Sequence, residues 1–384
     1  MKTPVRKKVA EANNIDTTKY SYSLLIDANN LLKISLVNKE LNDQGKDCGG
    51  VSMFLYQLGK ILEKKDFDYC TACWDGEGSG FLRWKLYPDY KANRDKNYAV
   101  HDPGITPEYK MQLLRERIIL DKVKSKAGTE DEDMCFQRQK KIIQEILDEL
   151  CIRQFEFNIV EGDDLISNYV KNKPSNEKVV IVSGDKDITQ LISPTVVVYN
   201  PTKKEFVTEG NASKLIGVRH DNVVLEKMLC GDPSDNIKGV KGVGEKTLHT
   251  YIPEFLTEKI DLDFVMNRVK EIQEDRKTKK QKPLVTLNNI MNGTTLGVQG
   301  DKLYEVNKAI IDLSEPLLTE DARKSMEEEC YAPIDITERD VKNVYKIFSN
   351  NHMYNLLDEN KFGGILAPFS RIIAQEKKRF INNC

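Results

Sequence analysis

Short apolar runs alternate along the first half of the chain with longer segments in which apolar residues recur at helical spacing. Four of the runs have the length and composition of strands: Tyr22–Ile26, Phe67–Trp74, Phe155–Val160 and Val179–Val182. The segments Met53–Leu62 and Phe136–Leu150 have the apolar spacing of helices. Alternation of strands and helices is typical of a mostly parallel, doubly wound sheet. We therefore predict an α/β domain over 21–225, preceded by an N-terminal extension over 1–20.

Each of the four predicted strands is followed by acidic residues. In chain order these acids are Asp27; Asp75; Glu161, Asp163 and Asp164; and Asp185 and Asp187. The carboxyl ends of the strands in a doubly wound sheet border one crevice, so we expect the seven carboxylates to meet there. A single acid after a strand is often only a helix cap or a turn residue. Four strands that end in this way favour a functional cluster.

A cluster of carboxylates predicts a metal site. Close, unscreened carboxylates repel one another by on the order of several kcal/mol, so they stay ionised together only with cations between them. Ligand sets made of oxygen suit Mg²⁺, or Mn²⁺ in its place, and not zinc. Two such ions about 3.5–4 Å apart would hold a phosphodiester and lower the pKa of an attacking water. The four histidines (His101, His220, His249 and His352) form no evident cluster along the sequence.

A glycine-rich stretch from Gly231 to Thr247 reads GDPSDNIKGVKGVGEKT. It is not a P-loop, because Glu245 stands where that motif requires lysine. We interpret 236–250 as a helix-hairpin-helix, in which glycines let the backbone approach a phosphate and the next helix binds it with free N–H groups. The residues expected to bind nucleic acid are Gly239, Gly242, Gly244, Lys246 and Thr247. A simple tight turn between two helices is the alternative.

Asp232 and Asp235 stand three residues apart just before this hairpin. In one helical turn both could face the acidic crevice and complete the ligands of the second ion. A capping role is the alternative.

Composition narrows the class of protein. The 58 Lys+Arg and 60 Asp+Glu give a net charge of −2, which argues against a protein that coats nucleic acid non-specifically through its overall charge. Basic residues nevertheless cluster, with eleven against six acids over 81–127 and five in the seven residues Arg276–Lys282. Such patches bind phosphate or form a solvated face.

Cysteine usage and hydropathy indicate the compartment. Cys70 and Cys73 form the one C-x-x-C pair among eight cysteines, so no zinc site is predicted. No apolar run reaches the roughly 20 residues of a membrane span, and the basic start lacks the apolar core of a signal peptide. We expect a cytoplasmic protein that makes no membrane contact.

Several motifs together resemble the 5′ nuclease superfamily, which includes the flap endonucleases and the 5′ nuclease domain of bacterial DNA polymerase I. These motifs are the acid series, the segment Pro88–Arg94 (PDYKANR), the GDKD of 184–187 and the hairpin. The motifs resemble most the phage branch, that of the T-even ribonuclease H with 5′→3′ exonuclease activity. If a phage encodes the chain, the resemblance implies the host cytoplasm as its location. The resemblance covers roughly Ser21 to Thr250 and rests on the order of the motifs, each of which is modest alone.

The resemblance implies roles for individual residues. The nine acids named above match the metal ligands of the family. Lys91 and Arg94 match the basic pair that contacts the scissile phosphate, and Tyr90 matches the neighbouring aromatic position; an ordinary exposed loop is the alternative. An arch over about 81–135 would hold a single-stranded 5′ arm, although His101–Pro107 should break its helix. The hairpin would grip duplex DNA and hold K⁺, and a helical C-terminal domain would occupy 226–384.

The function implied is that of a magnesium-dependent, structure-specific 5′→3′ exonuclease and flap endonuclease acting on DNA and RNA/DNA duplexes. Its task would be removal of RNA primers during lagging-strand replication. A single-strand-binding protein or a sliding clamp is the expected partner, and a monomer the expected state. The tail Arg371–Cys384 would dock such a partner or form a solvated helix.

Two other functions fit part of the pattern. A PIN-type ribonuclease also gathers carboxylates at strand ends, but the hairpin and the YKANR segment argue against it. The second is a module that binds branched DNA and has lost catalysis. The complete set of acids argues against it, because such a module would not need them.

Overall fold

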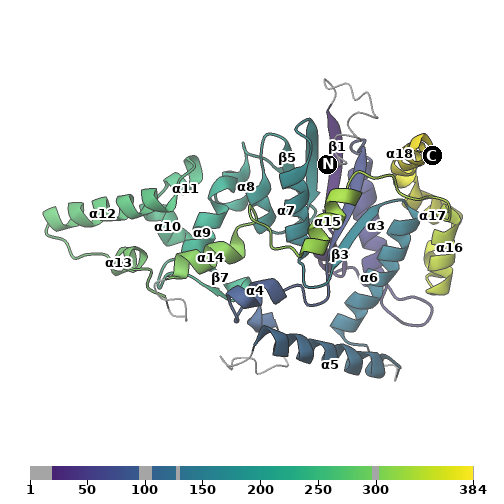
Figure 1. Cartoon of the computed structure of the whole chain (residues 1–384), viewed down its shortest axis with the longest axis horizontal. Helices are drawn as coiled ribbons and strands as arrows, with labels where there is room; N and C mark the ends of the chain where they lie inside the picture. Colours follow the sequence, from purple (N-terminus) through teal and green to yellow (C-terminus); the bar gives the residue numbers. More distant parts are fainter. Residues whose placement is uncertain (1–19, 95–105, 127–129, 296–301, 384) are drawn as a thin grey trace, which may run out of the picture.

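A six-stranded sheet forms the centre of the protein (Figure 1). The structure is a computed structural model that describes residues 20–94, 106–126, 130–295 and 302–383, with the backbone alone for 94 and 117–126. The strands are β1 (Ser21–Asp27), β2 (Tyr69–Asp75), β3 (Arg153–Phe157), β4 (Glu177–Val182), β5 (Val196–Asn200) and β6 (Glu205–Val207). Their order is β3-β2-β1-β4-β5-β6, and every pairing is parallel except that of β5 with β6. The predicted doubly wound sheet is confirmed, and β5 and β6 extend it beyond the four predicted strands.

Both faces of the sheet are buried at the central strands β1, β2, β4 and β5, which explains why the inner residues of these strands are mostly apolar. Side chains alternate between the faces, so Leu24 and Ile26 of β1 lie in one core and Leu25 in the other. The first face is covered by α2 (Ala28–Ser35), α3 (Gly49–Leu62) and α6 (Glu132–Glu149). The second is covered by α7 (Gly162–Asn172), α8 (Ala212–Ile216) and the 3₁₀ helix η2 (Asp187–Leu191).

The chain reverses its direction of winding next to β1. β2 and β3 lie on one side of β1, and β4 and β5 lie on the other. The carboxyl ends of these strands therefore border a topological switch point, where ligands bind in sheets of this kind.

A third apolar core lies beyond this edge. It is built by residues between 216 and 304, including Leu229, Phe255 and Val265. Its helices are α9 (Val223–Cys230), α10 (Glu245–Tyr251), α11 (Glu254–Thr257), α12 (Leu262–Thr278), α13 (Val285–Met291) and α14 (Leu303–Ile311), joined to η3 (His220–Asn222) and η4 (Pro233–Asp235). The short strands β7 (Gly231–Asp232) and β8 (Ile237–Lys238) pair beside it. In Figure 1, α12 and α13 project from the sheet at one end of the molecule.

The last helices return to the sheet. Met326 of α15 (Glu320–Glu329) joins the second-face core, and Phe348 of α16 (Val341–Asn350) joins the first-face core. The remaining elements are η6 (Tyr354–Leu356), α17 (Glu359–Leu366), η7 (Ala367–Phe369) and α18 (Ser370–Asn383). The range 226–384, expected to be one helical domain, thus contains two groups of helices that pack in different places.

The range expected to form the arch contains α4 (Phe81–Leu86), η1 (Ala92–Arg94) and α5 (Pro107–Lys126). α5 begins at Pro107, at the end of the segment expected to break the arch helix, and 95–105 lie outside the described residues. Within the described ranges, no helix combines the length and apolar character that crossing a membrane requires.

Candidate metal centre

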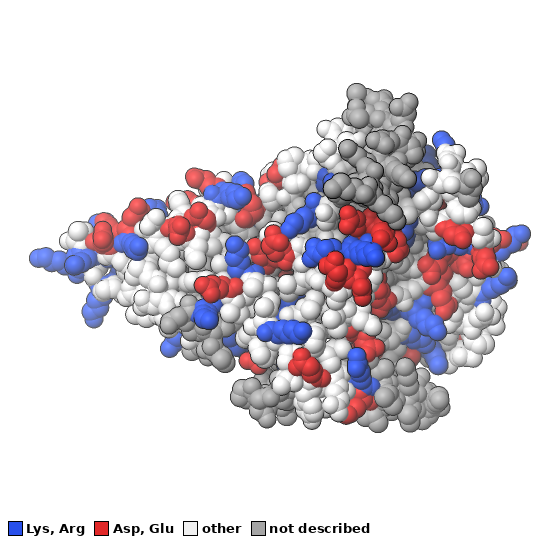
Figure 2. All heavy atoms as spheres, in the orientation of Figure 1, with Lys and Arg blue, Asp and Glu red and all other residues white. Residues whose placement is uncertain are grey.

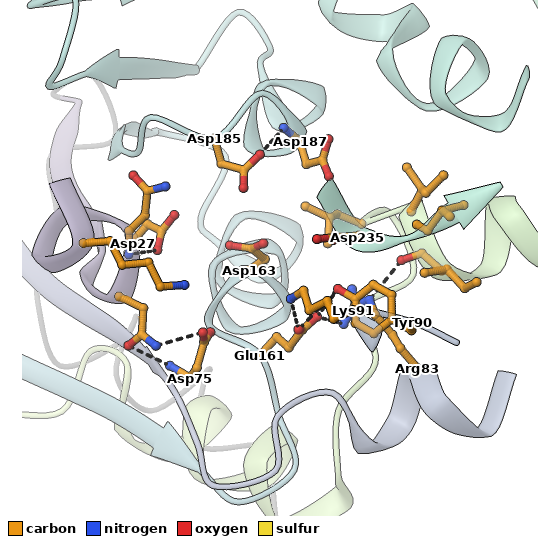
Figure 3. Close-up of a pocket in the computed structure, with 17 residues that line it drawn as sticks. Asp27, Asp75, Arg83, Tyr90, Lys91, Glu161, Asp163, Asp185, Asp187 and Asp235 are labelled. Carbon is orange, nitrogen blue, oxygen red and sulfur yellow. Dashed lines mark hydrogen bonds and ion pairs between the residues drawn. The ribbon is translucent and has the colours of Figure 1, made fainter. Parts of the chain in front are cut away.

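A polar pocket lies at the carboxyl ends of the central strands, and Figure 3 shows carboxylates directed into it from several elements. Its acidic residues are Asp27, Asp75, Glu161, Asp163, Asp185, Asp187 and Asp235. The basic side chains that line it are Lys33, Arg83 and Lys91. The sheet and the hairpin region thus contribute to one site, as the strand-end pattern indicates.

Hydrogen bonds fix the acids that end β1 and β2. Ser183 Oγ donates to Asp27 Oδ2 at 2.7 Å, and the Asn30 backbone N–H donates to Asp27 Oδ1 at 3.1 Å. Asn29 Nδ2 donates to Asp75 Oδ2 at 2.8 Å, and the Gly162 N–H donates to Asp75 Oδ1 at 2.8 Å. Asp27 therefore also caps α2, so a capping role and a place in the pocket coexist.

The charge of the acids is poorly compensated by the protein around Asp27, Asp163 and Asp187. Burial, with Asp75 and Asp185 nearby, raises the pKa of Asp27 to about 7. Burial and the neighbouring Asp27 and Asp185 raise the pKa of Asp163 well above its ordinary value. Burial also raises the pKa of Asp187 to about 6, even though Lys227 opposes the shift. Without added cations, these three carboxyls therefore keep their protons to a higher pH than isolated carboxyls do.

A group of three acids overlaps the pocket and adds Asp232 to it. Carboxylate oxygens of Asp187, Asp232 and Asp235 lie within 4.8 Å of one another. Lys227 Nζ lies 2.6 Å from Asp232 Oδ2 and also forms an ion pair with Asp187. Burial would raise the pKa of Asp232, but Lys227 and Ser234 hold it below the ordinary value. Asp232 caps η4 through the Ser234 N–H, so the capping alternative describes it in part.

Asp164 is the strand-end acid that does not line the pocket. It is buried, and its two carboxylate oxygens accept hydrogen bonds from Arg83 Nη1 at 2.6 Å and Arg83 Nη2 at 3.2 Å. The Leu317 N–H donates to it at 2.9 Å. The expectation that Asp164 lies among the acids of the crevice therefore needs correction: its charge is paired inside the protein.

Glu161 differs from the other pocket acids because cations surround it. Arg83 Nη1 lies 2.6 Å from Glu161 Oε2, Tyr90 donates its hydroxyl to the same oxygen at 3.0 Å, and Lys91 pairs with Oε1. Burial alone would raise its pKa, but Lys91 and Arg83 outweigh burial and lower the pKa of Glu161 to about 2. Figure 3 shows Arg83, Tyr90 and Lys91 gathered on one side of the pocket. The side chain of Arg94 lies outside what the structure describes.

Two of these cations, Arg83 and Lys227, were not among the predicted site residues. Arg83 stands between Leu82 and Trp84 on a short helix, and Lys227 stands on α9 five residues before Asp232. Neither position carries a sequence signal beyond a basic residue near a motif, because each acquires its role through partners distant in the fold.

Arg83 offers a stability test. We expect Arg83→Met to lower the free energy of unfolding by about 3–5 kcal/mol, because it leaves Asp164 buried without its cation. The double variant Arg83→Met/Asp164→Asn should recover much of that loss. Urea unfolding measures both; equal losses in the single and double variants would contradict the pairing.

The hairpin has the backbone that its glycines predict. A side chain at Gly239 would collide with the backbone of Cys230 and Gly231, and Gly242 has φ +79°. Gly244 caps α10, whose first turn carries Lys246, an exposed residue, and Thr247, a half-exposed one. The hairpin therefore presents the start of a helix and a lysine to solvent, a combination that can bind phosphate.

Ion pairs connect this hairpin to the acidic loop. Lys186, between Asp185 and Asp187, lies 2.6 Å from Glu226 and 2.9 Å from Glu245 of α10. Glu226 also contacts His249 at 2.7 Å. The relative position of the hairpin helix and the pocket is thus fixed by charged side chains.

Comparison of the sequence with known proteins identifies a family and several relatives. Residues 22–217 match the family described as 5′-3′ exonuclease, N-terminal resolvase-like domain. The chain is 29% identical over 224 residues to a 5′-3′ exonuclease of Bacillus subtilis, a match that covers 57% of this chain and 64% of that protein. It is 28% identical over 239 residues to DNA polymerase I of the same organism, covering 60% of this chain and 23% of the polymerase. The match therefore spans less than two thirds of either relative.

Solved structures share the fold. A bacteriophage T5 5′-exonuclease with bound divalent metal ions (zinc) has a TM-score of 0.56 at 18% identity, covering 85% of this chain and 99% of that chain. A bacteriophage T5 flap endonuclease in complex with DNA and metal ions has a TM-score of 0.54 at 16% identity, with the same coverage. At these identities the likeness concerns the fold.

Proposed function

Because the chain belongs to the 5′-3′ exonuclease family, whose N-terminal resolvase-like domain matches residues 22–217, we propose that it is a divalent-metal-dependent nuclease that hydrolyses phosphodiesters near 5′ ends. The observation that carries the proposal is the pocket in which acids from β1, β2, α7, the loop after β4 and the hairpin region meet. We propose both 5′→3′ exonuclease and flap endonuclease activity.

The acids fit divalent cations by their chemistry. All the candidate ligands are carboxylates, the donors that Mg²⁺ and Mn²⁺ prefer. Asp27, Asp75, Asp163 and Asp185 would hold one ion, and Asp187, Asp232 and Asp235 a second. Ions held there would polarise the phosphodiester and lower the pKa of water. Asp164 would act by holding Arg83 in place and not as a ligand.

The basic side chains of the pocket would act on the phosphate. Lys91 lies beside the acids, and its Nζ is 4.8 Å from the centre of the Tyr90 ring. A fixed cation at this place would oppose the negative charge that grows on the phosphate during attack. Arg94, three residues further, would contact the same phosphate.

The hairpin would bind the duplex beside the cut. Backbone N–H groups around Gly239, Gly242 and Gly244, with Lys246 and Thr247, would contact one phosphate backbone, and backbone carbonyls of the hairpin would hold K⁺. Such contacts involve no base edges, so binding should be independent of sequence and weaken as salt rises. Substrates would then be DNA flaps and RNA primers on DNA, with a replication protein as partner.

The test is cleavage of a duplex with a 5′ flap labelled at its 5′ end, with Mg²⁺ and with chelator. We expect short labelled products with Mg²⁺ alone, from flaps of DNA and of RNA on DNA. Cleavage confined to unpaired RNA would favour the PIN-type ribonuclease. Binding of the flap without cleavage in Mg²⁺ would favour the binding module.

The raised pKa values predict a pH-dependent effect of metal on stability. A carboxyl whose folded pKa is raised stabilises the fold fully below its unfolded pKa, and this contribution is lost as pH rises through the folded value. For Asp27, shifted from 3.8 to about 7, the metal-free protein should therefore lose stability between pH 4 and 7. Mg²⁺ competes with those protons and relieves the repulsion at higher pH.

We thus expect 10 mM Mg²⁺ to raise the melting temperature at least about 3 °C more at pH 8 than at pH 5.5. Differential scanning calorimetry measures the two increments. Asp163→Asn should raise the melting temperature of the metal-free protein at pH 8 and shrink the Mg²⁺ increment. An increment independent of pH would contradict this assignment of the cluster.

A further inference from the structure

The far end of the α12–α13 projection carries a dense group of basic residues, here called the basic tip: Arg276, Lys277, Lys279, Lys280 and Lys282. With Asp275 as the one acid, the eight residues 275–282 carry five positive charges and one negative, a net +4 in a chain whose total is −2. The four lysines are exposed. Figure 2 shows basic side chains at the end of the molecule where α12 ends in Figure 1.

The projection is an ordered part of the fold. Val265 and Val269 of α12 are fully buried with Leu287 and Ile290 of α13. Gln273 Nε2 donates to the Leu284 carbonyl at 2.8 Å, and its Oε1 accepts from the Leu284 N–H at 3.0 Å. The two helices are thus joined to within one turn of the basic tip.

Internal hydrogen bonds close the tip itself. Arg276 Nε donates to the Lys282 carbonyl at 2.9 Å, and the Gln281 N–H donates to the Arg276 carbonyl at 2.8 Å. Lys279 pairs with Asp275 at 2.7 Å. The lysines are therefore presented from a fixed turn.

The projection is also anchored directly on the hairpin. Asn289 Nδ2 donates to the Lys241 carbonyl at 2.9 Å, and the Lys241 N–H donates to the Thr294 carbonyl at 2.8 Å. Lys241 lies between Gly239 and Gly242, so the base of the projection contacts the loop that we assign to a duplex. The position of the tip relative to that duplex is set by these contacts.

We propose that the basic tip is a second contact for duplex DNA, which binds the phosphate backbone several base pairs beyond the hairpin. The inference rests on the proposed function, which places the duplex on the hairpin. α12 has 17 residues and, at about 1.5 Å per residue, spans about 25 Å. At about 3.4 Å per base pair, the tip lies up to about seven base pairs along the duplex. Lysines on a fixed turn suit phosphates, whose recognition needs charge and no base-specific geometry.

The test measures binding to duplexes of 6 to 24 base pairs in chelator, where no cleavage occurs. In the triple variant Lys277→Gln/Lys280→Gln/Lys282→Gln the affinity for the longest duplexes should fall about tenfold or more, with little change for the shortest. The salt slope of log K on long duplexes should decrease by up to about 2.7, as expected for three lost phosphate contacts. Arginine at the same three positions should restore both.

The matched control removes three exposed lysines from the opposite end of the molecule: Lys342→Gln/Lys346→Gln/Lys361→Gln, on α16 and α17. It makes the same change in net charge and should leave the length dependence intact. Equal losses in the two triple variants, or equal losses on short and long duplexes, would overturn the proposal. No loss on any duplex would also overturn it and leave the tip as a surface for an acidic protein.

The design separates this inference from the proposed function. Flaps on a short duplex arm should be cleaved equally by the tip variant and the unchanged protein. If the unchanged protein cleaves no flap but the tip variant loses affinity for long duplexes, the nuclease assignment fails and the tip contact stands. If flaps are cleaved and duplex binding ignores the tip, only the tip contact fails.

Discussion

Asp185→Asn should reduce the single-turnover rate of flap cleavage at least about 10³-fold, while flap affinity stays within about threefold. A loss of about 4 kcal/mol of transition-state stabilisation corresponds to this factor. Asp185 lies in the pocket after β4, where its Oδ1 accepts the Asp187 N–H at 2.9 Å. Asparagine keeps the size of the side chain and an acceptor for that bond, but it removes the charge that a cation requires.

Rapid-quench kinetics at saturating enzyme isolates the rate, and binding in chelator gives the affinity. Asp43→Asn, at an exposed acid outside the pocket, is the matched control and should change neither. Residual cleavage within tenfold of the unchanged protein would remove Asp185 from the metal-holding set. A matching loss of affinity would instead indicate a disturbed fold.

Lys91→Ala is the second large effect: we expect turnover to fall about 10²–10³-fold, as when one fixed charge donor is removed from a transition-state site. Affinity for the duplex should change little, because the hairpin would carry that contact. Glu161 would keep Arg83 and Tyr90 as partners, so the pocket should persist. Lys91 has φ 56°, in the left-handed region. Alanine carries a Cβ as lysine does, so the strain of this backbone conformation should be similar in the variant and the unchanged protein.

The test measures two constants for the same flap: the single-turnover rate of cleavage and the equilibrium affinity. Lys85→Ala, an exposed lysine of α4, serves as the control and should alter neither constant. Rate and affinity lost in equal proportion would count against a catalytic role for Lys91 and favour simple phosphate binding.

The apolar runs of the sequence, and the acids that follow them, predict four of the six strands and most of the acidic edge of the sheet. The reason is physical: a strand buried on both faces is a short, mostly apolar run. The carboxyl ends of parallel strands lie at one edge of the sheet, where the crevice of the switch point opens. Asp27, Asp75 and Asp185 therefore reach the pocket as their positions predict. The return of α16 and α18 to the sheet could not be predicted, because those helices have amphipathic patterns that any apolar face would satisfy.

The place of Asp164 could not be predicted from its position after a strand. It follows Asp163 directly in the first turn of α7, and consecutive residues of a helix point about 100° apart. Asp163 faces the pocket, and Asp164 turns to Arg83, 81 positions earlier in the chain. A local motif counts both acids, whereas their roles differ because Arg83 of α4 pairs with Asp164 and also donates to the Ile310 carbonyl of α14.

The central claim is that this acid cluster holds the divalent ions on which cleavage depends. The most direct measurement is a titration of the full chain with Mn²⁺, followed by electron paramagnetic resonance, with flap cleavage measured on the same samples. We predict about two ions per chain, cleavage that follows their occupancy, and loss of an ion in Asp163→Asn and of another in Asp235→Asn. Cleavage without bound Mn²⁺ or any other divalent ion, or ion binding that neither substitution alters, would contradict the account.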